Sequence, residues 1–281
     1  MRMLSLLVAL SGWILTFSLG AQAQASSAAK HNSAKAVYWS SRSEGIIYRW
    51  TEQDLTAIVM GKPVFSVASL LKKEFGKQDA DDVLTFYEVT FWPVSVVGPF
   101  LSYERDDYWD GGAHPSGGET FVSVDTRDPK QHLKLTDLFE AASIRGALLS
   151  DPIVQHILTR EKIAPPPTLE GLVKALSNKA FGGEMDGMFR FPNEFLDDFA
   201  FHHIENGKIA VRFLLPHGSE INRFHHTQLG LMLPIPARWK SAFLQASTGA
   251  SGAMTPSLQK TAHGRKSSVI LMDHAAPKKG G

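Results

Sequence analysis

The sequence contains no cysteine among its 281 residues. This absence excludes disulfide frameworks, thiolate zinc sites, thiol nucleophiles and iron–sulfur clusters. It also excludes the lipid-bearing cysteine that a bacterial lipoprotein needs just after its signal. The fold must therefore be stable without covalent cross-links.

An excess of one charge is also lacking, because 29 Lys and Arg residues stand against 28 Asp and Glu residues, giving a net charge of +1. The composition therefore gives no reason to expect nucleic acid as a partner. The fractions of hydrophobic residues (43%) and charged residues (20%) are close to soluble-protein averages. They exclude collagen-like, wholly disordered and multi-span membrane proteins.

Long hydrophobic runs are scarce, and the one that is present, residues 4–19, follows Arg2 and precedes Ala21-Gln22-Ala23. A basic start, an apolar stretch and a small-x-small tripeptide predict a signal peptide over residues 1–23, cut after Ala23. A single membrane anchor is the alternative, but the run is short and is diluted by Ser, Thr and Gly. We expect an exported mature chain, periplasmic or secreted, with no membrane span.

The remaining chain divides into three parts by composition. Residues 24–36 are mostly small and polar, which is typical of a flexible linker. Residues 37–245 carry the apolar periodicity of a folded domain. Residues 246–281 show little periodicity and carry five basic residues against Asp273, which predicts a disordered basic tail. Adhesion of this tail to anionic envelope polymers is the alternative interpretation.

The pattern over 37–245 predicts an α+β fold, a single domain with a mainly antiparallel sheet and helices on one face. Aromatic-rich runs predict a three-stranded meander at 84–93, 100–109 and 120–125, with Gly98-Pro99 as its first turn. Asn206-Gly207 predicts a two-residue turn between strands 199–204 and 209–215. Helices are expected at 51–61, 67–76, 138–149, 153–162, from 169 to about 182, and from 236 onward.

Three short runs in this domain occur in a fixed order. They are Phe100-Leu101-Ser102-Tyr103, Tyr108-Trp109-Asp110-Gly111-Gly112-Ala113-His114-Pro115 and Leu135-Thr136-Asp137-Leu138-Phe139. Together they resemble a bacterial extracytoplasmic domain family of largely unknown function, over residues 80–245. That family is best known as the C-terminal lysozyme-sensing part of the anti-sigma-V receptor (RsiV-type). The resemblance implies that the domain binds lysozyme.

Acidic residues gather between Leu101 and Glu119, where Arg105 is the only basic residue. We interpret the segment as a docking surface for a basic partner, with aromatic anchors among the acids; an ordinary solvated loop is the alternative. Because C-type lysozymes are basic, we expect lysozyme, another basic protein or an envelope component to bind. The predicted binding residues are Tyr103, Glu104, Asp106, Asp107, Tyr108, Trp109, Asp110, His114 and Glu119.

A catalytic role is the alternative function. Asp110, His114 and Glu119 would then form the acid–base site of a bacterial cell-envelope hydrolase. No nucleophile elbow and no metal-spacing motif accompanies these residues. We therefore favour non-catalytic binding, and we assign no catalytic residue and no cofactor.

The histidines give two further expectations. A zinc site built from His203, His217 and His225 is an alternative, because zinc accepts histidines from distant segments. Counting back from the Asn206-Gly207 turn pairs His202 with Val211. This register predicts that His202 lies in the core.

Overall fold

The computed structural model describes residues 36–76, 84–111, 115–130, 133–182, 189–217, 226–248, 253–254, 258 and 264–273. They belong to the larger of two units into which the chain divides, Lys35–Gly281. The predicted signal peptide and the predicted linker up to residue 35 lie outside the described residues, as do His114 and His225.

The first four strands form an antiparallel sheet in chain order. They are β1 (Val37–Ser43), β2 (Ile46–Thr51), β3 (Leu55–Val59) and β4 (Lys62–Ser66). Tyr48 and Trp50 on β2 are fully buried, as are Leu55 and Ala57 on β3. This period-two burial fixes which face of the sheet packs on the core.

The capped helix predicted over 51–61 is wrong, because this segment contains strand β3. Thr51 and Asp54 close the turn before the strand, where the Thr51 amide donates to the Asp54 carbonyl at 2.9 Å. The Asp54 carboxylate accepts from the Ala68 amide at 3.0 Å, in the first turn of the helix that follows β4. Thr56, Ile58 and Val59 are β-branched and favour the strand.

Helix α1 (Val67–Phe75) confirms the helix predicted over 67–76, and it follows directly after β4, which was not predicted. The Ser66 hydroxyl caps it by accepting a hydrogen bond from the Ser69 amide at 3.0 Å. Val67 and Leu71 are buried, so this face of the helix packs on the core.

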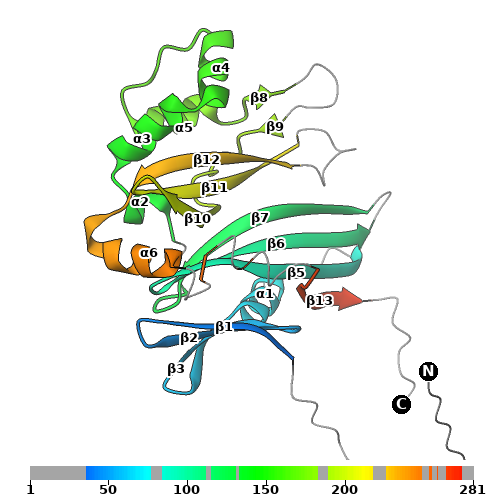
Figure 1. Cartoon of the computed structure of the whole chain (residues 1–281). Coiled ribbons are helices and arrows are strands. Elements are labelled where there is room, and N and C mark those ends of the chain that lie inside the picture. The colour runs from blue at the N-terminus through cyan, green and yellow to red at the C-terminus, as the bar shows by residue number, and fades with distance from the viewer. Residues whose placement is uncertain are drawn as a thin grey trace, which may run out of the picture. The chain divides into compact units, whose positions relative to one another are not determined.

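The predicted meander is confirmed as the main part of a second antiparallel sheet, in the order β13-β5-β6-β7 (Figure 1). Its strands are longer than expected: β5 (Leu84–Val97), β6 (Phe100–Gly111) and β7 (Ser116–Asp125). Gly98, with φ of 56°, forms the turn between β5 and β6. Residues 116–119, which lie before the third predicted strand, are the start of β7.

The outer strand of this sheet corrects the prediction of a tail disordered throughout 246–281. Strand β13 (Ser267–Asp273) pairs antiparallel with β5. The Ser267 hydroxyl donates to the Thr51 carbonyl at 2.5 Å and accepts from the Trp50 indole N–H at 2.9 Å. The seven residues of β13 thus form the outer strand of the sheet, and its buried Val269 packs into the core.

A third antiparallel sheet contains β10 (Phe199–Glu205), β11 (Lys208–Pro216) and β12 (His226–Pro234). The predicted hairpin is confirmed, and Asn206 and Gly207 both have positive φ, 50° and 72°.

The register predicted beyond this turn is wrong for His202. The pairing shifts between Phe201 and His203, so Phe201 and not His202 pairs with Val211. This bulge places Phe199 and Phe201 on the buried face, where the predicted register would have placed an alanine and a histidine. His202 is only half-buried.

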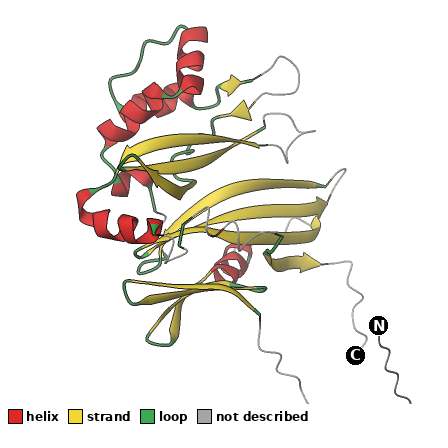
Figure 2. Cartoon of the chain, viewed as in Figure 1, coloured by secondary structure: helices red, strands yellow, loops and turns green. Residues whose placement is uncertain are grey.

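The predicted combination of helices and antiparallel strands is confirmed (Figure 2). The strands form several sheets, however, and the helices pack on more than one of them, so the prediction of one main sheet with helices on one face does not hold. In Figure 1, α1 lies between the first and second sheets, and most of the other helices pack around the third. Those helices are α2 (Leu135–Leu138), α3 (Ala141–Ser150), α4 (Pro152–Arg160), α5 (Leu169–Leu176) and α6 (Lys240–Ser247). A 3₁₀ turn (Ala237–Trp239) precedes α6, and two short strands, β8 (Ala180–Phe181) and β9 (Phe189–Arg190), form a small ribbon.

Two helix boundaries differ from the prediction. The helix expected at 138–149 is split at Phe139 and Glu140 into α2 and α3, and the Asp137 carboxylate accepts from the Lys134 amide at 2.9 Å at the start of α2. Helix α5 ends at Leu176, several residues before Gly182. One cluster of buried apolar residues extends from β2 through the second and third sheets to α5.

Candidate binding surface

The predicted binding residues do not form one surface, because strand β6 points successive side chains to opposite faces of the second sheet. Asp106 pairs with Glu119 of β7, so these carboxylates share a face. The same alternation adds further β6 residues to it. We call this the acidic face and define it by Glu88, Glu104, Asp106, Tyr108, Asp110, Glu119 and Ile270. Tyr103, Asp107 and Trp109 point to the opposite face.

Two members of the acidic face were missed in the sequence. Glu88 of β5 pairs with Tyr108, and Ile270 of β13 pairs with Glu88. The three side chains therefore form a row across three strands, with a carboxylate between two apolar groups. The strand alternation of the meander would have found Glu88, whereas Ile270 lies in a segment that we predicted to be disordered.

This row is accessible to a partner. Tyr108 is 37% exposed and Ile270 is 53% exposed, which places both among the few large apolar residues that the described part of the chain leaves exposed. Phe86 packs edge-on against Tyr108 at a centroid distance of 6.0 Å. The aromatic pair supports Tyr108 on its strand and leaves part of its ring in solvent.

Asp106 is the carboxylate whose surroundings are best defined on this face. Its carboxylate accepts from the Thr90 hydroxyl and from the Lys266 ammonium, both at 3.4 Å. Lys266 also lies over the Trp92 ring, 4.5 Å from its centroid. Burial raises the pKa of Asp106, the charge of Glu119 adds to this effect, and Lys266 acts in the opposite direction.

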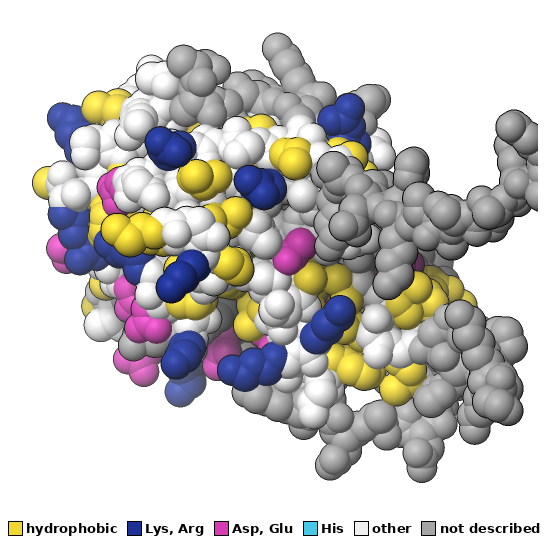
Figure 3. All heavy atoms as spheres, turned by 90° about the horizontal axis from the view of Figure 1, so that it is seen from below, with side chains coloured by type: hydrophobic (Ala, Val, Ile, Leu, Met, Phe, Trp, Pro, Cys, Tyr) yellow, Lys and Arg dark blue, Asp and Glu magenta, His cyan; other side chains and the backbone are white. Residues whose placement is uncertain are grey.

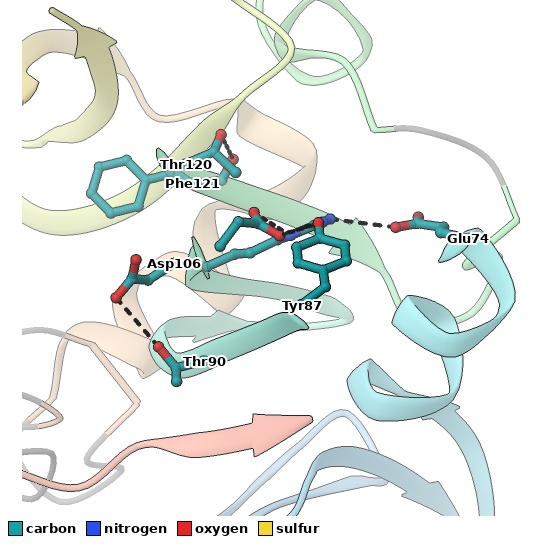
Figure 4. Close-up of polar contacts among 8 residues, drawn as sticks. Glu74, Tyr87, Thr90, Asp106, Thr120 and Phe121 are labelled. Carbon is teal, nitrogen blue, oxygen red and sulfur yellow. Dashed lines mark hydrogen bonds and ion pairs between the residues drawn. The ribbon is translucent and has the colours of Figure 1, made fainter. Parts of the chain in front are cut away.

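On the opposite face, Asp107 is committed to an internal network (Figure 4). The Arg105 guanidinium lies 2.8 Å from both carboxylate oxygens of Asp107. The Tyr87 hydroxyl donates to Asp107 at 2.7 Å, and Glu74 of α1 lies 3.4 Å from Arg105. Asp107, predicted as a docking residue, is therefore engaged within the protein, where its carboxylate holds a half-buried arginine in the sheet.

The network raises the pKa of two of its members, Tyr87 and Arg105. Burial, together with the hydrogen bond to Asp107 and its charge, raises the pKa of Tyr87 to about 12. For Arg105, burial lowers the pKa, but the hydrogen bond and charge of Asp107 outweigh it and raise the pKa above its usual value. Tyr87 therefore stays neutral and Arg105 stays charged across the physiological range.

The two aromatic anchors predicted at Tyr103 and Trp109 also lie on this opposite face. Tyr103 is only 1% exposed and packs edge-on against Phe91, at a centroid distance of 6.5 Å. Trp109 is half-buried and contacts the Tyr87 ring edge-on at 6.2 Å. Neither ring belongs to the acidic face, so the structure does not bring the three predicted anchors together.

The geometry does not favour the hydrolase alternative. Asp110 lies four residues along β6 from Asp106, the residue opposite Glu119. At about 3.3 Å per residue this separates the strand positions of Asp110 and Glu119 by roughly 13 Å. Glycosidase acid–base pairs have carboxyl groups about 5 to 9.5 Å apart. His114, the third member of that site, lies outside the described residues.

The histidines of the zinc alternative lie in different surroundings. His217 is buried with its ring edge-on to Phe189, 5.5 Å away. His203 shares an Nδ1–Nδ1 contact of 2.7 Å with His202 and lies 3.7 Å from Glu205. Among the described residues, no three His, Asp or Glu side chains are grouped so that they could hold a metal ion. His225 lies outside those residues.

Comparison with known proteins adds no relative. No family model matches the sequence, and no curated protein matches it. Within the described part of the chain, no helix combines the length and apolar character needed to cross a bilayer.

Proposed function

We propose that the chain is an exported, non-catalytic binding domain whose acidic face docks a basic protein, with a C-type lysozyme as the first candidate. The observation that carries this proposal is the row Tyr108–Glu88–Ile270, in which exposed apolar groups flank a carboxylate. Interfaces of this kind use a few aromatic or apolar anchors for affinity and surrounding charges for orientation and association rate.

The charges of the acidic face support a basic partner. The face carries five carboxylates from three adjacent strands: Glu88, Glu104, Asp106, Asp110 and Glu119. The described residues bring Lys266 to this face, beside Asp106. A partner surface rich in Lys and Arg would be attracted to the face at long range.

The resemblance supplies the identity of the first candidate. The motifs at residues 100–115 and 135–139 resemble a family whose best-known member senses lysozyme, and lysozyme of the C type is basic. Export by the predicted leader would place the domain where it meets such a partner.

Calorimetric titration of the full chain with a C-type lysozyme tests the proposal. We expect a micromolar or tighter Kd in dilute buffer that weakens by about tenfold or more between about 0.02 M and about 0.3 M salt. Tyr108→Ala removes the aromatic anchor and is expected to weaken binding about tenfold. Glu88→Gln is expected to weaken it severalfold by removing one charge.

The matched control is Glu170→Gln, which removes the same charge from an exposed position on α5, far along the chain from the acidic face. This variant should bind like the parent. A flat isotherm at millimolar lysozyme in dilute buffer would refute the proposal, as would equal losses for Glu88→Gln and Glu170→Gln.

A further inference from the structure

A groove of about 460 Å³ lies on the other face of the second sheet, beside α1. Side chains of β6 and β7 form its floor together with Leu70 of α1. The apolar part of its lining is Leu70, Val122, Val124 and Pro129. This volume falls within the range of small-molecule sites, about 300 to 1,000 Å³.

Tyr103 gives this groove a polar group that the protein itself does not use. The residue lines the groove although only 1% of its surface is exposed. Its ring contacts Phe91, but its hydroxyl makes no hydrogen bond within the described part of the chain. The hydroxyl is not one of the fully enclosed polar atoms without a partner in the described part of the chain, so solvent in the groove reaches it. A ligand in the groove that offers an acceptor oxygen can replace this water.

The charged lining residues show what kind of partner fits. Lys73 and Lys130 are exposed at the groove and have no ion pair among the described residues. The two carboxylates of the lining already interact within the protein: Glu74 lies 3.4 Å from Arg105, and Asp198 also has a protein partner. The groups left for a ligand are therefore donors and cations, so the ligand must supply acceptor oxygens and negative charge.

Carboxylates near the groove limit the charge that a ligand can carry. Figure 3 views the molecule from below Figure 1, and both basic and acidic side chains lie on that face, with apolar side chains between them. Figure 4 shows Glu74 on its helix and Thr120 on its strand on either side of the Arg105 network. A dianionic phosphate would meet the nearby carboxylates of Glu74 and Asp198, whereas a single negative charge avoids most of that repulsion.

We propose that this groove binds a small aliphatic carboxylate. The aliphatic chain would cover Leu70, Val122 and Val124, and the carboxylate would accept hydrogen bonds from the Tyr103 hydroxyl and from Lys73 or Lys130. This site is separate from the acidic face, because Tyr103 and Asp106 point to opposite sides of β6.

Calorimetric titration of the full chain with octanoate tests the proposal. We expect saturable binding with a submillimolar Kd, and roughly tenfold weaker binding of octan-1-ol, which has the same chain without the charge. Tyr103→Phe should weaken octanoate binding about fivefold, because it removes only the hydroxyl. Lys73→Gln/Lys130→Gln should weaken it about tenfold. Inorganic phosphate should bind more weakly than octanoate.

The control is Lys62→Gln/Lys72→Gln, which removes two exposed positive charges that do not line the groove. It should leave octanoate binding unchanged, and Tyr103→Phe should leave the melting temperature unchanged because its hydroxyl has no protein partner. Absence of saturation at about 10 mM octanoate overturns the proposal. So does an unaltered Kd for Tyr103→Phe, an equal loss in the control, or tighter binding of phosphate than of octanoate.

The result can be separated from the fate of the proposed function. Glu88→Gln lies on the acidic face and should leave the octanoate Kd unchanged, and octanoate should not compete with lysozyme. Either proposal can therefore be refuted while the other is confirmed.

Discussion

The two faces of strand β6 differ although their residues alternate along one short segment. On one face, Tyr108 remains partly in solvent beside Glu88 and Ile270. On the other, Asp107 is tied to Arg105 and Tyr87 and serves the fold. A run of acids in a sequence is therefore not a surface: in a strand, half of it faces each way, and packing on each side decides what each acid does.

The largest expected effect on stability comes from breaking the network of Asp107, Arg105 and Tyr87. Asp107→Ala should lower the free energy of unfolding by about 3 kcal/mol, because it leaves the half-buried Arg105 charge without its carboxylate. Denaturant unfolding measures this. The double variant Arg105→Leu/Asp107→Leu should recover most of the loss, since no unpaired charge remains. A loss below about 0.5 kcal/mol for Asp107→Ala would show that the network does not support the fold.

Substitutions of Trp109 and Tyr108, which are neighbours on β6, should affect stability and binding differently. Trp109→Ala should cost about 2 kcal/mol of stability, because the half-buried ring packs on Tyr87, and should leave lysozyme affinity unchanged. Tyr108→Ala should do the reverse, changing stability by less than about 1 kcal/mol and weakening binding. Thermal unfolding and calorimetry of the two variants provide the measurements. If both variants lost both properties equally, the division into two faces would be incorrect.

A smaller effect concerns His202, at the bulge where alternation is interrupted in β10. Burial lowers its pKa to about 4, with Arg212 and His203 adding to the effect. Since the unfolded chain has a histidine pKa of about 6.5, it binds more protons than the folded chain between about pH 6.5 and about pH 4. Stability should therefore fall as the pH is lowered through this window.

His202→Gln removes this titrating group and should flatten the slope of unfolding free energy against pH relative to the parent. Denaturant unfolding at several pH values gives both slopes. Identical slopes for parent and variant would contradict the assignment of His202 as a neutral, half-buried group.

The smallest expected effect is on the stability of the acidic face itself. Glu88→Gln and Glu119→Gln should each change the free energy of unfolding by no more than about 0.5 kcal/mol, because partly exposed carboxylates contribute little to folding. The measurement is the same denaturant series as for Asp107→Ala. A loss of about 2 kcal/mol in either variant would assign the acidic face to the fold and leave no reason to expect a partner there.

The sequence predicted the parts of this fold whose signals are local. The meander, α1 and the Asn206-Gly207 hairpin all rest on short-range alternation, capping or turn chemistry, and they are confirmed. What could not be predicted depends on distant partners. Strand β13 is a strand only because β5 offers an edge and Trp50 a hydrogen-bond donor.

The candidate surface follows the same rule. The concentration of acids on β6 was visible in the sequence, but their division between two faces needed the register with β5 and β7. The bulge at His202 depends on two phenylalanines that compete for the buried face of β10, which no count from the turn anticipates. The groove at Tyr103 required α1 to lie against the sheet, a tertiary fact with no local signal.

Strand β13 also affects how the protein would respond to proteolysis near its C-terminus. Because it covers the outer edge of β5, a chain nicked by a protease before Ser267 and stripped of its last segment would leave a row of backbone donors and acceptors open. Such an edge recruits strands from neighbouring molecules. Strand β13 thus protects the β5 edge from pairing with other molecules, and its loss would favour aggregation.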